Sequence, residues 1–368
     1  MKKNKVIFLI SKLSAGGAER VFAALINNLS KMKYEISLIV VNNSKLHYKL
    51  DNSVNIYNLN TNLLLAPIKI RRKLNLIKPD IVVSTVSFFN IYISLIRCIL
   101  PKNIVYIARE SNILKLLNKD ESFLKGFVLG TLLSKLFYKN GFNLFIAQTD
   151  AMKLEMNSFS NIELEKIRVI GNPFVDNQIK IKPKNEISKI KLLSIGRLHP
   201  QKGYFRIFKA LEMLDIDFEY LIIGKGPLEK KLKNYLSTSN IRNKIIFSEI
   251  ISNEKVKEIM VNYDMLLLGS HHEGFPNVVL EATNCNLPTI SFKCNNCLNG
   301  VVLDGLNGYI THSNKLEDFN DNIKKVINNQ YDIVEGKNFL NEKFNLNKIV
   351  NSYDELFSDI SKSRIKQY

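Results

Sequence analysis

The chain has 368 residues, of which 46% are hydrophobic and 23% are charged, and its formal net charge at pH 7 is +18. This length predicts two domains, because a single core rarely grows beyond ~250–300 residues. The composition is that of a globular protein, and every apolar run falls short of the ~20 residues that a membrane-spanning helix needs. The run Ile91–Leu100, for example, is interrupted by Arg97. We therefore expect no transmembrane helix.

The N-terminus passes from Met1–Lys5 directly into the apolar run Val6–Ile10. No small-residue cleavage site closes a long apolar region there, so a secretory signal peptide is not indicated. We expect this run to be the first strand and the protein to be cytoplasmic.

Strand-like apolar runs alternate with helix-like stretches, which predicts βαβ units, parallel sheets and an α/β fold. In the first half the predicted strands are Val6–Ile10, Ile36–Val41, Ile81–Thr85, Ile104–Ala108, Leu144–Ala147 and Val169–Ile170. In the second half they are Lys191–Ile195, Tyr220–Ile223, Ile245–Phe247, Met265–Leu268, Thr289–Ile290 and Gly308–Ile310. Two doubly wound domains follow, residues 1–175 and 176–345. The polar, Lys-rich stretch Val175–Lys189 reads as the linker, and Leu346–Ile360 has the apolar spacing of a helix.

Two glycines, Gly16 and Gly17, follow the first predicted strand and precede a predicted helix whose body is Val21–Leu29. Glycines there let the backbone approach a ligand, and a helix N-terminus favours a bound anion. A tight strand-to-helix connection without a ligand is the alternative. The spacing differs from the GxGxxG fingerprint, which disfavours a nicotinamide enzyme.

Positive charge is concentrated in the first half of the chain. Residues 1–175 hold 25 Lys and Arg against 11 Asp and Glu, whereas residues 176–368 hold 27 against 23. Such a surface attracts nucleic acid or an anionic membrane. The apolar segment Ile113–Lys139, with Lys125, Lys135 and Lys139 on one side if helical, favours a lipid surface; a buried helix with a solvated lysine edge is the alternative. The patch Ile68–Lys73 is explained equally well as ordinary helix surface.

The segment Ser194–Gly203 carries the features of a phosphate site. A predicted strand ends at Ile195, Gly196 frees the backbone, and Arg197 and Lys202 follow at the edge where α/β sheets bind ligands. Arginine offers a planar fork to phosphate oxygens and lysine a point charge.

Two glutamates eight positions apart, Glu273 and Glu281, flank the turn Gly274–Pro276. We expect Glu273 in a loop and Glu281 in the first turn of a helix, whose free N–H groups favour a bound anion. This arrangement predicts a pocket for a charged ligand rich in hydroxyl groups.

The four cysteines, Cys98, Cys285, Cys294 and Cys297, give little support for a metal site. Cys294 and Cys297 form one CxxC pair without a second pair or a histidine at ligand spacing. We expect no metal. His271 and His272 are adjacent, so their side chains diverge and flank the predicted pocket.

The segment Glu273–Glu281 resembles the Glu-x7-Glu motif of retaining glycosyltransferases of family 4, and Gly196–Gly203 is similar to the glycine–arginine–lysine motif of the same family. The turns Gly16–Gly17 and Ile223–Pro227, the loop Ile251–Glu254 and the turn Asp304–Gly308 resemble further family motifs in the same order. The likeness spans most of the chain. It implies the GT-B fold, with two Rossmann-like domains facing a central cleft and a C-terminal helix that crosses back to the first domain.

Two segments depart from the family pattern. Many members have a His-Asp pair where this chain has Ala108–Asn112, and many have Pro-Glu or Arg-Glu within the loop that here reads Cys294–Gly300. The groups on the acceptor side and around the sugar are therefore open.

The resemblance implies a metal-independent, retaining transferase that needs no cofactor. It moves a hexose or N-acetylhexosamine from a UDP-sugar to a lipid-linked or polysaccharide acceptor in bacterial surface glycan synthesis, at the inner face of the cell membrane. Arg197 and Lys202 would stabilise the leaving diphosphate, Glu273 would contact the sugar and Glu281 the ribose. The expected donor-binding positions also include Gly16, Gly17, Gly196, Gly226, Pro276, Asn277 and Val278, and the acceptor contacts Arg109 and Glu110.

Three alternatives stay open at this point. One is a UDP-sugar epimerase of the same fold, which needs no acceptor. Another is a sugar-nucleotide-binding protein without catalysis. A nucleic-acid-binding protein is disfavoured, because the basic surface lacks interleaved aromatic residues and a known binding motif.

Overall fold

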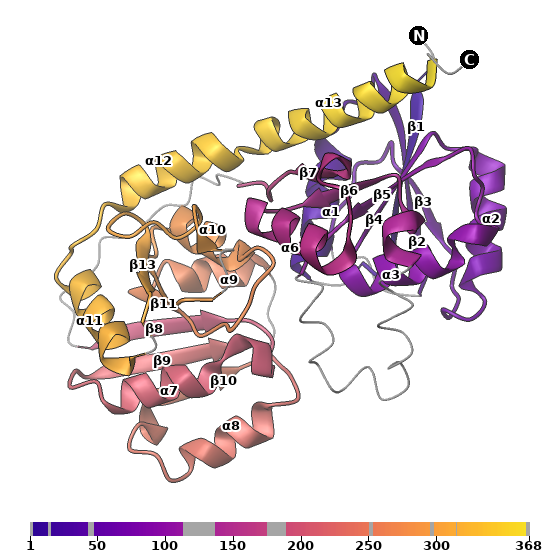
Figure 1. Ribbon diagram of the computed structural model, residues 1–368. Coiled ribbons are helices and arrows are strands. Elements are labelled where there is room, and N and C mark those ends of the chain that lie inside the picture. The colour runs from indigo at the N-terminus through magenta and orange to yellow at the C-terminus, as the bar shows by residue number, and fades with distance from the viewer. Residues whose placement is uncertain are drawn as a thin grey trace. The chain divides into compact units, whose positions relative to one another are not determined.

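The structure is a computed structural model that describes residues 3–13, 16–42, 48–112, 137–174, 189–249, 253–294, 298–313 and 315–365 (Figure 1). The chain divides into two compact units. Unit 1 consists of Met1–Pro173 and Leu346–Tyr368, and unit 2 consists of Phe174–Asn345. Most of the predicted linker, residues 175–188, and most of the Lys-bearing segment, residues 113–136, lie outside the described residues.

Unit 1 is built on a parallel sheet of seven strands in the order β3-β2-β1-β4-β5-β6-β7. The strands are β1 (Asn4–Ile10), β2 (Tyr34–Val40), β3 (Asn55–Asn58), β4 (Ile81–Thr85), β5 (Val105–Arg109), β6 (Leu144–Ala147) and β7 (Ile167–Val169). The helices are α1 (Gly17–Asn28), α2 (Ala66–Ile77), α3 (Ser87–Ile96), α6 (Asp150–Ser160) and α13 (Leu346–Ile365), with short 3-10 turns η1 (Arg97–Ile99) and η2 (Leu164–Lys166). Strand β3 was not predicted, because its polar sequence lacks an apolar run and it lies exposed at the sheet edge.

Apolar side chains bury both faces of this sheet. One face packs against α2, α3 and α6 through residues that include Ile70, Phe89 and Met156. On the other face Phe8 of β1 meets Phe22 of α1, with ring centroids 5.0 Å apart. Strands buried on both faces read as continuous apolar runs, which is why the central strands were predicted nearly to their ends.

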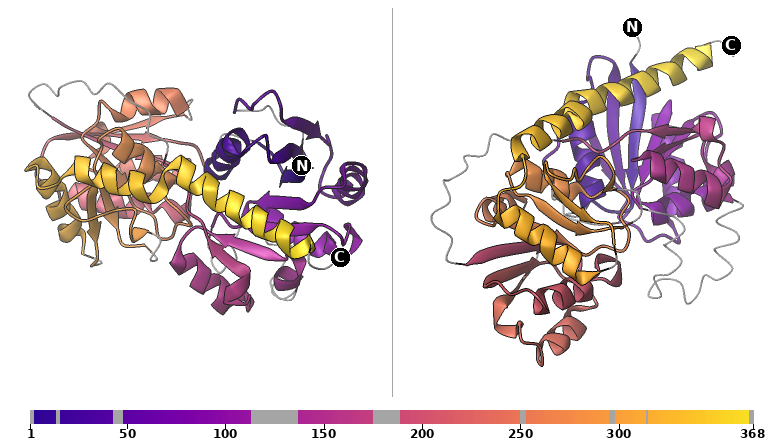
Figure 2. Two further views of the ribbon diagram at one scale, coloured as in Figure 1. Left: turned by 90° about the horizontal axis from the view of Figure 1, so that it is seen from above. Right: turned by 60° about the vertical axis from the view of Figure 1, so that its left-hand side comes forward.

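Helix α13, drawn in yellow in Figures 1 and 2, belongs to unit 1 although it follows unit 2 in the sequence. Asp354 accepts a hydrogen bond from the Tyr34 hydroxyl and pairs with Lys33 Nζ, each at 2.6 Å. The Phe357 ring packs edge-on against Tyr34. This helix runs five residues beyond the predicted end at Ile360. Within the described ranges, no helix combines the length and apolarity that crossing a bilayer requires.

Unit 2 holds a parallel sheet of six strands in the order β10-β9-β8-β11-β12-β13. The strands are β8 (Ile190–Ile195), β9 (Phe218–Ile223), β10 (Ile245–Ser248), β11 (Met265–Leu268), β12 (Thr289–Phe292) and β13 (Gly308–Thr311). The helices are α7 (Tyr204–Glu212), α8 (Glu229–Leu236), α9 (Asn253–Met260), α10 (Asn277–Asn284), α11 (Leu316–Ile327) and α12 (Ile333–Phe344), with 3-10 turns η3 (Pro200–Lys202) and η4 (Arg242–Lys244).

Helices cover both faces of the second sheet as well. One face packs against α7, α8 and α11 through a core that includes Phe208, Leu232 and Phe319. Figure 1 shows α9 and α10 on the other side of the strands. Each unit is therefore a doubly wound α/β sheet, as predicted.

Candidate functional site

The strand order of unit 2 reverses direction between β8 and β11. The chain leaves β8 toward β9 on one side of the sheet and leaves β11 toward β12 on the other. In open α/β sheets, ligands bind outside the carboxyl ends of the strands at such a point. The segment after β8 contains Gly196, Arg197 and Lys202, and the segment after β11 contains Glu273, so the topology brings these predicted residues together.

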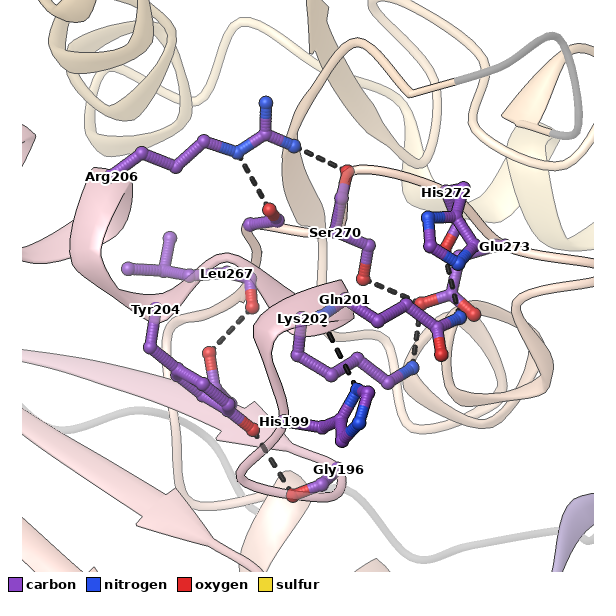
Figure 3. A network of polar contacts seen from close by, with 12 residues as sticks. Gly196, His199, Gln201, Lys202, Tyr204, Arg206, Leu267, Ser270, His272 and Glu273 are labelled. Carbon is purple, nitrogen blue, oxygen red and sulfur yellow. Dashed lines mark hydrogen bonds and ion pairs between the residues drawn. The ribbon is translucent and has the colours of Figure 1, made fainter. Parts of the chain in front are cut away.

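The two loops are joined by hydrogen bonds in both directions, and Figure 3 shows the bond that Gln201 donates to the second loop. The main-chain N–H of His271 donates to the Gln201 carbonyl at 2.8 Å, and Gln201 Nε2 donates to the His272 carbonyl at 2.9 Å. Arg206, on the first turns of α7, donates to the carbonyl groups of Gly269 and Ser270. The segment that carries Glu273 is thus fastened to the segment that carries Lys202.

Arg206 is itself held in place from the core side. Its guanidinium lies 4.6 Å from the centroid of the Phe292 ring. Burial lowers the pKa of Arg206 to about 10. Because it donates to two consecutive carbonyl groups of the loop, this arginine holds the loop in position.

An ion pair occupies the centre of the site. Lys202 Nζ lies 2.6 Å from Glu273 Oε1, and the hydroxyl of Ser270 donates to the same oxygen (Figure 3). The side chains are only 20% and 10% exposed. A cation and a hydrogen-bond acceptor therefore stand side by side at the sheet edge, where one ligand with a phosphate and a hydroxyl group can meet both.

Glycines allow the loops to approach one another by their backbones. Gly203 has φ +58°, and a Cβ on it would lie 1.8 Å from the Gly269 carbonyl oxygen. A Cβ on Gly226 would lie 2.3 Å from the Leu198 carbonyl oxygen. At Gly196 the space is less tight, and its carbonyl accepts a hydrogen bond from the Tyr204 hydroxyl at 3.1 Å. The close backbone contacts therefore require glycine at positions 203 and 226, whether or not a ligand binds there.

Helix α10 begins at Asn277, with Pro276 as its N-cap. Asn277 and Val278 lie in the first turn, where N–H groups lack partners within the helix. Glu281 is the fifth helical residue, so the prediction that it lies in the first turn is wrong. The apolar segment around buried Phe275, which packs on Phe344, holds the helix start at Asn277.

Arg197 lies exposed in the loop after β8. No residue that the structure describes forms an ion pair with it. The guanidinium is therefore available to an anion, in contrast to the paired Lys202.

Cys294 is buried just after β12, whereas Cys297 lies outside the described residues. Across the described parts of the chain, no three His, Cys, Asp or Glu side chains are grouped so that they hold a metal ion. The loop Ile251–Glu254 also lies outside the described residues, apart from the backbone of its last two residues.

In unit 1, Gly16 caps α1 and Gly17 is its first residue. The carboxylate of buried Glu19 folds against Gly16, so closely that a Cβ on the glycine would lie 2.1 Å from Glu19 Oε2. The Tyr48 hydroxyl donates to the Gly16 carbonyl at 2.9 Å. A carboxylate of the chain itself therefore stands at this helix start, and an anionic ligand there would meet it.

Arg109 and Glu110, at the end of β5, are both fully buried. Arg109 donates to Thr85 and Asn172, and Glu110 accepts from Asn90 Nδ2 at 2.8 Å and from the Tyr138 hydroxyl. Burial raises the pKa of Glu110. Their predicted contact with an acceptor stays a prediction.

Comparisons with known proteins agree with this architecture. Residues 15–177 match the family model Glycosyltransferase Family 4, and residues 176–342 match Glycosyl transferases group 1. An uncharacterized glycosyltransferase of Methanocaldococcus jannaschii is 30% identical over 302 residues, 76% of this chain and 74% of the relative. An uncharacterized glycosyltransferase of Haemophilus influenzae is 26% identical over 363 residues, 95% of this chain and 98% of the relative.

Two solved structures share the fold. The lipopolysaccharide outer core galactosyltransferase WaaB superposes with a TM-score of 0.72 at 20% identity, covering 96% of this chain and 99% of that one. The Anabaena protein HepE in complex with UDP-glucose superposes with a TM-score of 0.73 at 17% identity, again covering 96% and 99%. The fold and the site define a glycosyltransferase with the GT-B architecture. The chain belongs to the family of glycosyl transferases group 1, and it is an enzyme of that class, as the sequence predicted.

Three residues of the site were not predicted from the sequence: Gln201, Arg206 and Ser270. Ser270 and Glu273 lie three positions apart, but Arg206 precedes Ser270 by 64 positions and Gln201 precedes His272 by 71. Only the adjacency of β8 and β11 brings them together, and no pattern within either segment indicates that adjacency.

Proposed function

We propose that the protein transfers a hexose or N-acetylhexosamine from a UDP-sugar to a lipid-linked or polysaccharide acceptor, with retention of the anomeric configuration and without a metal ion or cofactor. The observation that carries the proposal is the Lys202–Glu273 pair at the carboxyl edge of β8 and β11, which offers a cation and a hydroxyl acceptor together. The UDP-glucose complex of HepE supports the donor class, and the similarity to WaaB, a lipopolysaccharide outer core galactosyltransferase, supports a surface glycan as the product.

In the proposed reaction the bond between the anomeric carbon of the sugar and the diphosphate oxygen breaks, and its electron pair stays on that oxygen. An acceptor hydroxyl oxygen bonds to the anomeric carbon in its place, and the proton of that hydroxyl leaves with UDP. Negative charge grows on the leaving group and positive charge on the sugar. Lys202 and Arg197, with the N–H groups at the start of α10, would stabilise the leaving diphosphate. Glu273 would accept hydrogen bonds from sugar hydroxyl groups, and Glu281 from the ribose.

Thermal unfolding with a panel of nucleotide sugars tests the donor. A bound donor raises Tm by mass action, by an amount that grows with its concentration above Kd. We expect UDP and at least one UDP-sugar to raise Tm, with GDP-mannose as the control for the base. Stabilisation by GDP-mannose without any response to UDP or UDP-sugars would overturn the proposed donor.

Turnover separates transfer from the alternatives. We expect the stabilising UDP-sugar to release UDP when a lipid-linked or polysaccharide acceptor is supplied, with the sugar recovered on the acceptor. Conversion of the UDP-sugar to its epimer without an acceptor would favour an epimerase instead. For the location of the enzyme we propose the cytoplasmic face of the membrane, where a lipid-linked acceptor is within reach.

A further inference from the structure

Helix α2 presents an exposed apolar face on the surface of unit 1. Its buried stripe, Ala66, Ile70 and Leu74, belongs to the core. On the opposite side of the helix, the side chains of Ile68 and Leu76 are 57% and 75% exposed. Just before the helix begins, Leu64 and Leu65 are 85% and 53% exposed. Single exposed leucines are ordinary, whereas several on one helix face mark an interaction surface.

Basic residues are interleaved with these apolar ones. Between Asp51 and Asp80 the chain has no acidic residue and five basic ones, Lys69, Arg71, Arg72, Lys73 and Lys78. Lys69 and Lys73 are turned to local partners, the Leu59 carbonyl and the Tyr57 ring. Arg71 and Arg72 are exposed, and no described residue forms an ion pair with either.

The helical period places the two kinds of side chain on one face. At about 100° per residue, Ile68, Arg72 and Leu76 point within about 80° of one another, away from Ile70 and Leu74. A helix with apolar side chains flanked by long cationic ones is the pattern that lies in the interface of a lipid bilayer, with the cations at the headgroups. The segment is also anchored from the core side, because the Tyr92 hydroxyl donates to the Leu63 carbonyl at 2.6 Å.

We propose that this face, defined by Leu64, Leu65, Ile68, Arg72 and Leu76 with Arg71 at its edge, docks unit 1 onto an anionic lipid bilayer. Charge complementarity selects this partner: a second copy of the chain would bring the same positive face, and a nucleic acid offers nothing to the four apolar side chains. The inference rests on the proposed function in one respect, namely that a lipid-linked acceptor would lie in the same membrane. The residues of this face are separate in sequence from the segment Ile113–Lys139.

Cosedimentation of the full chain with vesicles tests the proposal. The vesicles are phosphatidylcholine alone or phosphatidylcholine with phosphatidylglycerol. We expect binding to the anionic vesicles, weakened by salt, and Arg71→Gln/Arg72→Gln should weaken it roughly tenfold or more, because each exposed cation adds to the attraction. Ile68→Ser/Leu76→Ser should weaken it as well, since the apolar side chains then no longer enter the interface.

Lys230→Gln/Lys231→Gln is the matched control, since it removes two adjacent exposed cations from α8 of unit 2. It should change vesicle binding less than twofold. All variants should keep the wild-type response of Tm to UDP, which shows that they are folded and separates this inference from the donor assignment.

Equal vesicle binding by wild type and both α2 variants would overturn the inference even where UDP still binds. Equal binding to neutral and anionic vesicles would overturn its electrostatic basis, and loss of self-association in Ile68→Ser/Leu76→Ser without loss of vesicle binding would assign the face to a second copy.

Discussion

Lys202 and Glu273 form an ion pair, and this pairing changes the effect of removing either residue. Without Glu273, the lysine is free for a phosphate group. Without Lys202, the largely buried Glu273 carboxylate loses its cation, and its Oε1 keeps the hydrogen bond from the Ser270 hydroxyl. The two residues therefore act on the donor as a coupled pair. We expect the free-energy effects of the two single substitutions not to be additive in the double variant.

Loss of either counter-charge should slow the chemical step. We expect Arg197→Ala and Lys202→Ala each to lower kcat by roughly 100-fold or more, because an interaction that strengthens in the transition state acts on kcat. Lys209→Ala, which removes an exposed cation from α7, is the control. Steady-state kinetics with and without EDTA provide the measurement, and the wild type should stay active in EDTA. A variant altered only in KM would make that residue a binding contact, and inhibition by EDTA that magnesium reverses would contradict the metal-free mechanism.

The two glutamates should separate binding from turnover. We expect Glu281→Ala to weaken UDP binding, because the ribose loses its acceptor. Glu273→Ala should leave UDP affinity unchanged or raise it, since it releases Lys202 for the diphosphate, while kcat falls. Calorimetry with UDP on both variants, together with kinetics, measures this split. A loss of UDP affinity in Glu273→Ala as large as in Glu281→Ala would contradict the assigned roles.

Glu110 should make stability depend on pH in a particular direction. Burial raises its pKa in the folded protein above the ordinary value of 4.5. The folded state therefore holds this proton more tightly than the unfolded state, and the stabilising contribution present below pH 4.5 is lost as the pH rises through the folded pKa. Glu110→Gln keeps an acceptor oxygen for Asn90 and Tyr138 but cannot ionise.

We expect the Tm of Glu110→Gln, relative to wild type, to rise between pH 4.5 and pH 8. Calorimetric scans across this range measure it. Glu165→Gln, at an exposed position of η2, controls for the loss of one negative charge. A difference in Tm that falls with pH would show that Glu110 is stabilised as an anion.

At the scale of elements, the contact between the loops after β8 and β11 depends on Gly203. An alanine there has to adopt φ +58° and also meets the Gly269 carbonyl. Gly305 has φ +76° with nothing within 4 Å of its missing Cβ, so Gly305→Ala carries only the backbone strain. We expect about 1 kcal/mol of destabilisation for Gly305→Ala and roughly 3 kcal/mol or more for Gly203→Ala. Denaturant unfolding measures both, and equal losses would mean that the loop contact contributes nothing.

The elements that the sequence predicted best are the buried parallel strands, such as β6 and β11, whose bounds are those predicted. A strand that is buried on both faces has an unbroken run of apolar residues, which can be recognised in the sequence. Strand β3 has no such run, because it lies exposed at the sheet edge. Its strand conformation depends on pairing with β2, which its own residues do not indicate. In helix α10, a proline N-cap and a buried phenylalanine fix the start at Asn277, so Glu281 falls in the second turn.

At the scale of the molecule, the sequence identified the charged residues of the site but not their support. Lys202 and Glu273 were recognised separately from short motifs, each with its own expected ligand. Their ion pair, and the fastening of the two loops by Gln201 and Arg206, arise from strand order in the sheet. Strand order is a long-range property, and periodicity within a single segment does not encode it.

The route of the chain between the units has a consequence for biosynthesis. Unit 2 is inserted into unit 1: the chain enters it at Phe174 and leaves it after Asn345, and the Phe174 N–H donates to the Phe344 carbonyl at 2.6 Å, so entry and exit lie side by side. A ribosome delivers all of unit 2 before it delivers α13, which covers Tyr34 in unit 1. The inserted unit is thus complete in sequence before the unit that begins the chain, which needs a helix synthesised after the insertion to cover Tyr34.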